Sequence, residues 1–231
     1  MVVQVVNLGL IDYNEALDIQ EKVLTLRMQG DIQDTLLLLE HFPVLTMGRR
    51  AAQSNILASK QFLEEQGIRI YEVSRGGDVT YHGPGQLIGY PIFDLNNFGK
   101  DVRKFVGNIE EIFIELLKKQ YDIDAGRDPV HTGVWVGQEK ITAIGFAIKR
   151  WVSMHGFAFN VNTNMEHFKW IVPCGIGDKG VTSLEKILGK KQDFAKTAEL
   201  VTQCLAKVFD VEIKMLERQQ FLQKLSILQK L

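Results

Sequence analysis

Residues 134–161 read VWVGQEKITAIGFAIKRWVSMHGFAFNV and contain three extended segments in a row, with no helical segment between them. Residues 134–136 and 141–148 flank the turn-like residues 137–139, a pattern that predicts a β-hairpin. Residues 153–161 predict a further strand directly afterwards. Because strands that follow one another without a helical crossover favour antiparallel pairing, this stretch argues against a doubly wound parallel sheet.

Outside this stretch, predicted strands and helices follow each other along the chain. Asp12 is the expected N-cap of a first helix over residues 12–28, with Glu15 as its return partner. An apolar stripe predicts a second long helix over residues 102–117. The other predicted strands cover residues 2–8, 35–39, 41–47, 69–73 and 87–93, and the other helices cover residues 59–66, 192–208 and 217–229. Since no repeat or linker divides the chain, we expect residues 1–231 to form a single domain of the α/β (α+β) class, with a mixed, largely antiparallel sheet flanked by helices.

Composition and charge argue against several classes of function. The chain has 231 residues, of which 45% are hydrophobic and 24% charged, and its net charge is −1. Without an overall basic field, binding to nucleic acid is not expected. No apolar run approaches the ~20 residues that cross a bilayer, and residues 1–16 lack the features of a signal or transit peptide. We therefore expect a cytoplasmic protein that does not bind membranes.

The segment 75–86, RGGDVTYHGPGQ, interrupts the regular pattern. Its four glycines and one proline predict a loop whose backbone can approach a ligand closely. An ordinary tight loop would explain the glycines, but not the polar side chains among them, so we predict a binding segment. It lacks the GxxxxGK[ST] pattern of a phosphate-binding loop.

The segment 172–177, VPCGIG, places Cys174 between proline and glycine. A turn of this kind would expose backbone N–H groups, which suits a nucleophile beside an oxyanion site. The other cysteine, Cys204, belongs to an apolar helical stripe and is expected to be structural. Two cysteines do not make a disulfide framework, and we expect both to be reduced.

Lys140 and the histidines give weaker signals. Lys140 lies where the predicted hairpin enters an apolar strand, and residues 139–145 alone favour a solvated turn lysine. The five histidines lack the close spacing of a metal site and no CxxC is present, so we expect no metal and no cofactor. The spacing leaves open a cysteine-hydrolase pair of Cys174 with His82 or His155.

Taken together, these segments resemble the lipoyl(octanoyl)transferase B family, the octanoyl-acyl-carrier-protein:protein N-octanoyltransferases. The matching stretches are RGGDVTYHGPGQLIGYPI (75–92), EKITAIGFAIKRWVSMHGFAFNV (139–161) and PCGIGDKGVTSLEK (173–186). Weaker likeness extends over residues 8–17 and 36–50, so the resemblance covers most of the chain. It implies a fold like that of biotin and lipoate protein ligases.

The resemblance also implies a Cys/Lys dyad, which falls on Cys174 and Lys140 and replaces the solvated interpretation of Lys140. The lysine cation would stabilise the thiolate. The thiolate would take an octanoyl group from its carrier and pass it to a lysine of another protein, with neither ATP nor metal. The family's acyl-binding segments fall on Arg75, Gly76, Gly77, Asp78, Val79, Thr80, Tyr81 and His82, on Ala143, Ile144 and Gly145, and on Gly156, Phe157 and Ala158.

The implied donor is octanoyl-acyl carrier protein. The implied acceptors are the lipoyl domains of 2-oxoacid dehydrogenase complexes and the glycine cleavage H protein. Candidates for docking the acidic donor are Arg49, Arg50, Lys149, Arg150 and Lys179, although each is equally well explained as a solvated side chain.

Three other classes of function remain open from the sequence. An ATP-dependent lipoate or biotin ligase would share the implied fold, but it would have no nucleophilic cysteine. A cysteine thioesterase would release free acid. A domain that only binds acyl carrier protein or lipoyl domains would need no activated Cys174.

Overall fold

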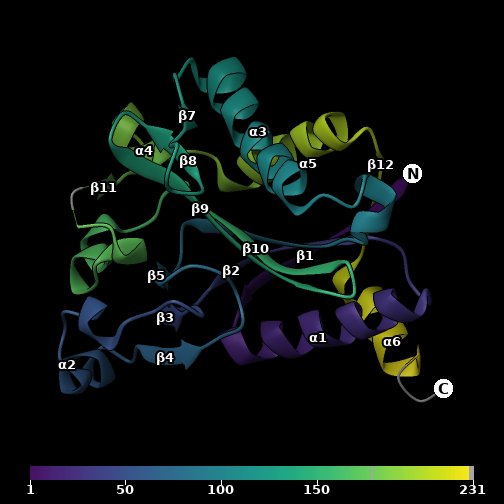
Figure 1. Ribbon diagram of the computed structural model, residues 1–231, viewed down its shortest axis with the longest axis horizontal. Coiled ribbons are helices and arrows are strands. Elements are labelled where there is room, and N and C mark those ends of the chain that lie inside the picture. The colour runs from purple at the N-terminus through teal and green to yellow at the C-terminus, as the bar shows by residue number, and fades with distance from the viewer. Residues whose placement is uncertain (178, 229–231) are drawn as a thin grey trace.

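The computed structural model describes residues 1–177 and 179–228, apart from the side chain of Cys174. Within this part of the chain, a nine-stranded sheet forms the centre of the molecule (Figure 1). β1 runs parallel to β12 and β2, and every neighbouring pair from β2 to β7 is antiparallel. The predicted mixed, largely antiparallel sheet is thus confirmed. Its order is β12 (Glu212–Leu216), β1 (Val2–Ile11), β2 (Thr35–His41), β6 (Gln86–Ile92), β10 (Val152–Asn160), β9 (Glu139–Lys149), β8 (Val134–Val136) and β7 (Gly126–Arg127), with β11 (Gly180–Val181) beside β9.

The segment 134–161 supplies the three neighbouring strands β8, β9 and β10, as predicted. β9 and β10 pair from Lys149 and Val152 at their hairpin tip down to Thr142 and Phe159. In this register Gly145 of β9 lies opposite Gly156 of β10. The two glycines face each other in the middle of the sheet, where the candidate site is found.

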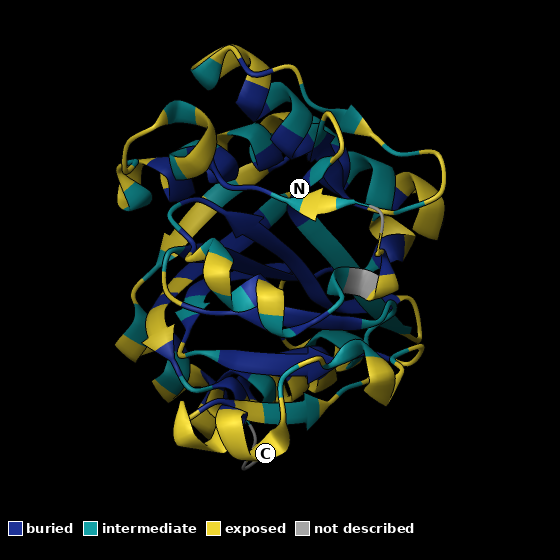
Figure 2. Cartoon of the chain, turned by 90° about the vertical axis from the view of Figure 1, so that its left-hand side faces the viewer, coloured by how far each residue is buried: buried dark blue, intermediate teal, exposed yellow. Residues whose placement is uncertain are grey.

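Helices cover both faces of this sheet (Figure 1). α3 (Val102–Tyr121) and α5 (Phe194–Phe209) share one apolar core with the sheet, and α1 (Tyr13–Gln29) and α6 (Arg218–Leu228) share another. Figure 2 shows the result, with buried residues filling the sheet and exposed residues on the outer surfaces of the helices.

The alternation of side chains along β1 supplies both cores. Val3 and Val5 belong to the cluster with α3 and α5, whereas Val6 and Leu8 belong to the cluster with α1 and α6. This two-residue period is what a strand buried on both faces requires.

A second sheet of three strands lies at the lower left of Figure 1. Its order is β4 (Arg69–Glu72), β3 (Val44–Met47) and β5 (Val79–His82). Leu63 of α2 (Lys60–Glu65) and Phe168 of the 3₁₀ helix η3 (Met165–Trp170) belong to the apolar cluster of this sheet.

The strand β5 lies inside the segment that we predicted as a loop, so that prediction was wrong for residues 79–82. Val79 and Tyr81 are buried in the apolar cluster of the small sheet, whereas Thr80 and His82 line a cavity. Pairing with β3 supplies the backbone partners. The glycines on either side of this strand concealed an alternating pattern of only four residues.

Several short elements were missed because they offer too few residues for a periodic pattern. They are β7, β11, β12 and the helix α4 (Leu184–Leu188). The predicted N-cap of α1 is confirmed, since the Asp12 carboxylate accepts a hydrogen bond from the Asn14 N–H at 2.9 Å. In the described part of the chain, no helix is long and apolar enough to cross a membrane.

Candidate active site

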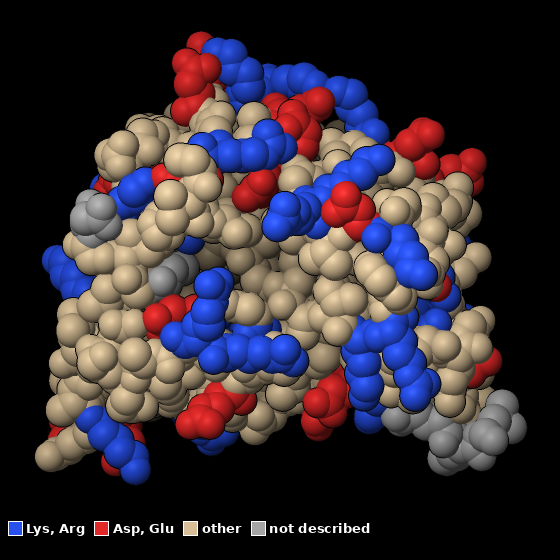
Figure 3. Space-filling model, viewed as in Figure 1, with Lys and Arg blue, Asp and Glu red and all other residues tan. Residues whose placement is uncertain are grey.

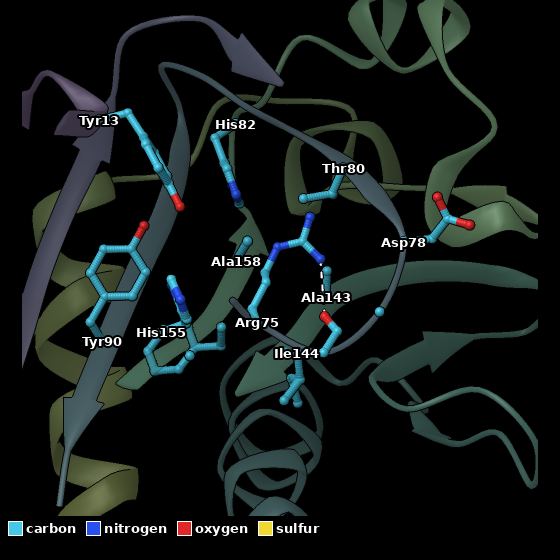
Figure 4. Close-up of a pocket in the computed structure, with 15 residues that line it drawn as sticks. Tyr13, Arg75, Asp78, Thr80, His82, Tyr90, Ala143, Ile144, His155 and Ala158 are labelled. Carbon is cyan, nitrogen blue, oxygen red and sulfur yellow. Dashed lines mark hydrogen bonds between the residues drawn. The ribbon is translucent and has the colours of Figure 1, made fainter. Parts of the chain in front are cut away.

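A cavity of about 50 Å³ lies between the small sheet and strands β9 and β10 (Figure 4). The cavity brings together the three segments that the resemblance assigned to acyl binding. Of those residues it is lined by Arg75, Gly76, Gly77, Asp78, Thr80, His82, Ala143, Ile144, Gly145, Gly156, Phe157 and Ala158.

Val79 and Tyr81 are the two assigned residues that do not line this cavity. Because β5 is a strand, they point to the opposite side from Thr80 and His82. The Tyr81 hydroxyl lies 2.6 Å from His167 Nδ1, within the core of the small sheet.

Two glycines allow backbone segments to meet at the cavity wall. A Cβ at Gly145 would lie 2.9 Å from the carbonyl oxygen of Gly76, and a Cβ at Gly156 would lie 2.1 Å from that of Gly89. The Gly76 N–H donates to the Phe146 carbonyl at 3.0 Å, which ties the loop to β9. Any side chain larger than hydrogen would push these segments apart, as expected where backbones approach closely.

The Arg75 guanidinium crosses the centre of the cavity and is held by backbone and hydroxyl oxygens (Figure 4). One of its NH₂ groups donates to the Thr46 carbonyl at 2.7 Å and to the Thr46 hydroxyl at 2.8 Å. The other donates to the Gly76 carbonyl at 3.1 Å. These bonds fix a positive charge at a defined position in the cavity wall.

Buried, neutral histidines line the cavity or lie directly behind it. Burial lowers the pKa of His82 to about 3 and that of His155 to about 4. Behind them, burial lowers the pKa of His41 to about 4. Groups with such values are poor general bases near neutral pH, so a cysteine-hydrolase pair with His82 or His155 is disfavoured.

Sequence reasoning did not assign Tyr13, Tyr90 and His155 to the cavity, yet all three line it. Tyr13 lies at the start of α1 and Tyr90 lies in β6, and in the sequence both are ordinary members of regular elements. Burial raises the pKa of Tyr13 to about 12, so its hydroxyl keeps its proton. Only the fold brings these distant residues together.

His155 has an unusual backbone conformation for its place within β10. Its φ is 61°, a left-handed value that non-glycine residues adopt at a cost. Two contacts hold it there: its N–H donates to Gln20 Oε1 at 3.0 Å, and its Nε2 lies 3.1 Å from the Ser74 hydroxyl. A signal for this residue was available, since His155 is polar within an apolar strand.

Lys140 lies at the start of β9 and is only 6% exposed, so it is not a solvated turn lysine. Gly133 makes room for its stem, because a Cβ there would lie 3.3 Å from Lys140 Cε. The ammonium stands 4.8 Å from the centre of the Trp135 ring, and the Lys179 ammonium stands 4.9 Å from the same ring. A cation over an indole is electrostatically favourable, so this contact helps to fix the lysine.

The turn that contains Cys174 is the 3₁₀ helix η4 (Pro173–Gly175). The Val172 N–H donates to the Asn55 carbonyl at 2.7 Å, and Asn55 Nδ2 donates to the Asp78 carboxylate at 2.7 Å. Gly175 has a φ of 69°, and a Cβ there would lie 2.7 Å from that carboxylate. The turn is therefore packed against the glycine-rich segment at Asp78.

The expectation of exposed N–H donors in this turn was wrong for two positions. The Gly175 N–H donates to the Val172 carbonyl at 3.0 Å, and the Ile176 N–H donates to the Pro173 carbonyl at 3.1 Å. The tight 3₁₀ geometry satisfies both groups inside the turn.

Downstream of the turn, β11 returns the chain to Lys140. β11 runs parallel to β9, with Gly180 opposite Glu139 and Val181 opposite Lys140. Lys140 and Gly175 consequently line one cleft, although Lys140 and Cys174 are thirty-four positions apart in the sequence. The side chain of Cys174 lies outside the described residues, so its pairing with Lys140 stays a prediction. Five residues border both this cleft and the cavity: Gly76, Gly77, Asp78, Ile144 and Gly145.

Solved structures with a similar fold are ligases. A lipoate-protein ligase A bound with ATP aligns with a TM-score of 0.76 over 94% of this chain and 89% of its own, at 12% identity. A biotin protein ligase from Aquifex aeolicus aligns with a TM-score of 0.52 over 90% of this chain and 69% of its own, also at 12% identity. These likenesses confirm the expected fold.

Sequence comparisons give the family. An octanoyltransferase of Caldicellulosiruptor saccharolyticus is 54% identical over 220 residues, which cover 95% of this chain and 94% of that protein. An octanoyltransferase of Desulforamulus reducens is 55% identical over 213 residues, which cover 92% and 93%. The lipoyl protein ligase A/B catalytic domain model matches residues 12–206. The resemblance found in the sequence is confirmed, and this chain belongs to the lipoyl protein ligase A/B catalytic domain family.

Proposed function

We propose that this chain is an acyltransferase that moves an octanoyl group from octanoyl-acyl carrier protein to a lysine of a lipoyl domain, through a thioester on Cys174. The observation that carries the proposal is the cleft that Lys140 shares with Gly175, the neighbour of Cys174. Relatives that are 54% and 55% identical and named octanoyltransferases support the reaction type.

The reaction has two steps. The Cys174 thiolate attacks the carbonyl carbon of the donor thioester, the carbon–sulfur bond to the carrier breaks, and the carrier leaves as a thiol. The ε-amine of the acceptor lysine then attacks the acyl-enzyme, an amide forms, and the Cys174 thiol is regenerated. In the first step the Lys140 ammonium stabilises the thiolate and gives a proton to the departing carrier sulfur. In the second step the resulting neutral amine takes a proton from the acceptor amine and passes it to the departing cysteine sulfur.

The cavity provides for the acyl tail. The apolar wall of the cavity consists of Ile144, Phe157 and Ala158. The glycine-rich loop lines the cavity beside them. Burying methylenes at ~0.8 kcal/mol each would contribute about 5 kcal/mol for an eight-carbon chain. Because one methylene changes little in this total, preference for chain length should be graded.

An acidic carrier protein would meet positive charge at the entrance to the site. Several Lys and Arg side chains border the hollow in the face shown in Figure 3, with Asp and Glu side chains among them. Arg49 and Arg50 are exposed, and their N–H groups donate to Arg75 and Gly77, so both belong to this rim. We propose Arg49 and Arg50 as the docking cations.

The other three candidate docking residues fit less well. Lys179 forms an ion pair with Asp128. Lys149 and Arg150 lie at the hairpin tip, about 30 Å along β9 from Lys140 at ~3.3 Å per residue. We therefore leave them out of the docking surface.

The test is the intact mass of the protein after mixing with octanoyl-acyl carrier protein, for the wild-type chain and for Cys174→Ala. We expect one octanoyl group that hydroxylamine removes, and none on the variant. Cys204→Ala, which replaces the cysteine of α5, is the matched control and should acylate as the wild type does.

Other outcomes would contradict the proposal. Octanoylation of a lipoyl domain from free octanoate that depends on ATP would indicate a ligase. Release of free octanoate at the same rate with and without a lipoyl domain would indicate a thioesterase. Full transfer activity in Cys174→Ala would remove the cysteine from the mechanism.

We further propose that residues 1–231 act as a single catalytic domain, with lipoyl domains of 2-oxoacid dehydrogenase complexes and glycine cleavage H protein as acceptors. Purified acceptors assayed one at a time would test this list, and an acceptor that gains no octanoyl group would be removed from it. The cytoplasmic location stays a prediction.

A further inference from the structure

A chain of buried hydrogen bonds leads from the cavity to the backbone of Lys140. His82 Nδ1 lies 2.8 Å from Gln86 Oε1, and Gln86 Nε2 donates to Asn160 Oδ1 at 2.9 Å. Asn160 Nδ2 donates to the Thr182 carbonyl at 3.0 Å, and the Thr182 N–H donates to the Lys140 carbonyl at 3.0 Å. All five residues are at most 7% exposed, so water competes little for these bonds.

Two backbone carbonyls determine which atoms donate and which accept in this series of hydrogen bonds. A carbonyl oxygen only accepts, so the NH₂ group of Gln86 faces the Tyr81 carbonyl and that of Asn160 faces the Thr182 carbonyl. The amide oxygen of Gln86 therefore accepts from His82, which must carry its proton on Nδ1. Because burial lowers the pKa of His82 to about 3, this arrangement holds at neutral pH.

The series of hydrogen bonds ends on a short segment between the turn at Cys174 and the helix α4, whose Leu184 is buried in the core. β11 is two residues long, and it follows the turn that contains Cys174. Besides the two-residue ladder with β9, the Gly180 N–H donates to the Gln138 carbonyl at 3.1 Å and the Thr182 N–H donates to the Lys140 carbonyl at 3.0 Å. So short a ladder is weak, whereas Asn160 lies in the central strand β10 and is itself held by Gln86.

We infer that Asn160 is a positioning residue, which holds the chain after Cys174 in register with Lys140 by fixing the Thr182 carbonyl. The inference rests on the proposed function, because it concerns the spacing of the two proposed catalytic residues. Gln86 acts one step further back by orienting the Asn160 amide. Without this anchor, β11 would shift along or away from β9, and the turn would move with it.

The test compares Asn160→Asp with Asn162→Asp. Asn160→Asp keeps the shape of the side chain and, as the carboxylate, has no donor for the Thr182 carbonyl; Asn160→Leu, which has no donor in any protonation state and adds no charge, is measured beside it and should show the same changes. Asn162 is the matched control, because its Nδ2 also donates to a backbone carbonyl, that of Gln192, at 2.9 Å. It therefore holds a different segment, next to α5 rather than β9.

These variants are made in a Cys204→Ala background, so that Cys174 is the only thiol. Three quantities are measured: kcat and KM of octanoyl transfer, the pH midpoint of iodoacetamide alkylation of Cys174, and Tm. The alkylation midpoint reports the thiolate and would not respond to a merely structural role.

For Asn160→Asp we expect kcat to fall about 100-fold, the effect of a misplacement of about 1 Å, with little change in KM. We also expect the alkylation midpoint to rise, because a shift of the turn would move the proposed thiolate away from the Lys140 cation that is proposed to stabilise it. Asn162→Asp should leave both quantities unchanged. If Asn160→Asp does not fold, Gln86→Met, which keeps Asn160 but removes its anchor, should shift both quantities in the same direction.

A wild-type kcat and midpoint in Asn160→Asp would overturn the inference, as would equal losses in both asparagine variants that follow Tm. Absence of an octanoyl adduct on the unmodified chain would instead contradict the proposed function. The two failures are therefore distinguishable.

Discussion

At Gly145 and Gly156, the absence of a side chain determines the shape of the cavity wall. Gly145 and Gly156 face each other across β9 and β10, and each touches a backbone carbonyl of a neighbouring segment. These carbonyls belong to Gly76 and Gly89, which the sheet and the loop hold in place. The wall can therefore not yield as a flexible side chain would.

Gly156→Ala should lower the free energy of unfolding by ~1–3 kcal/mol, as overpacking does in a filled core. Its Cβ would lie 2.1 Å from the Gly89 carbonyl and 2.7 Å from Pro91 Cδ. The matched control is Gly107→Ala in α3, where a Cβ meets nothing within 4 Å and helix propensity predicts a gain of ~0.5–1 kcal/mol. Urea denaturation measures both, and a Gly156→Ala protein as stable as the wild type would contradict the packing argument.

The residues of the site were predictable to different degrees. Arg75 and the glycines of residues 75–86 stood out because the segment broke its local pattern. Lys140 did not stand out by itself, since its burial against Trp135 depends on the hairpin fold. Tyr13 and Tyr90 had no local signal, because a tyrosine at the start of a helix or within a strand is ordinary.

Individual strands each place one buried histidine near the cavity. His41 ends β2, His82 ends β5, and His155 lies within β10. The His41 Nε2 lies 2.8 Å from the Tyr90 hydroxyl, and its ring centre lies 5.9 Å from that of His82. Burial of all three as neutral rings connects the stability of these strands to pH.

Stability should fall as pH decreases from about 6.5 towards 5. The pKa values of His41, His82 and His155 are lowered from 6.5 to about 4, 3 and 4, so below pH 6.5 the unfolded chain binds protons that the folded chain does not. Each such proton contributes a slope of up to ~1.4 kcal/mol per pH unit. Urea denaturation at several pH values measures the slope, and a free energy of unfolding that stays constant or rises on acidification would contradict it.

The elements differ in how well the sequence predicts them. The long helices and the strands of residues 134–161 were predictable because a periodic pattern runs through each of them. β5 was not, because its four residues lie between glycines. β11 has only two residues and exists because the sheet and Asn160 hold it, so a local pattern could not reveal it.

Across the whole molecule, charge is distributed unevenly even though the net charge is −1. Lys and Arg side chains border the hollow in Figure 3, with Asp and Glu side chains among them. The Arg49 N–H donates to the Arg75 carbonyl, so Arg49 lies next to the cavity. An acidic donor would be attracted to this face without any overall basic field. Such attraction acts mainly on the rate of encounter.

The value of kcat/KM for octanoyl-acyl carrier protein should fall as salt rises, because the Debye length shrinks from ~10 Å at 0.1 M to ~3 Å at 1 M. The double variant Arg49→Ala and Arg50→Ala should lower kcat/KM at low salt and flatten this dependence. Lys22→Ala, an exposed cation on α1, is the control. A salt dependence that is already flat in the wild type would argue against docking by charge.

The strand β9 carries Lys140 at one end and the cavity wall at Ala143–Gly145 a few residues further on. At a rise of ~3.3 Å per residue, the five positions from Lys140 to Gly145 span about 16 Å. The length of this strand segment therefore sets the distance between Lys140 and the cavity wall. Deletion of one residue within this interval would shorten the distance and turn every later side chain of the strand to the opposite face of the sheet. We therefore expect an inserted residue to be tolerated at the hairpin tip, at Arg150 and Trp151, but not between Lys140 and Gly145.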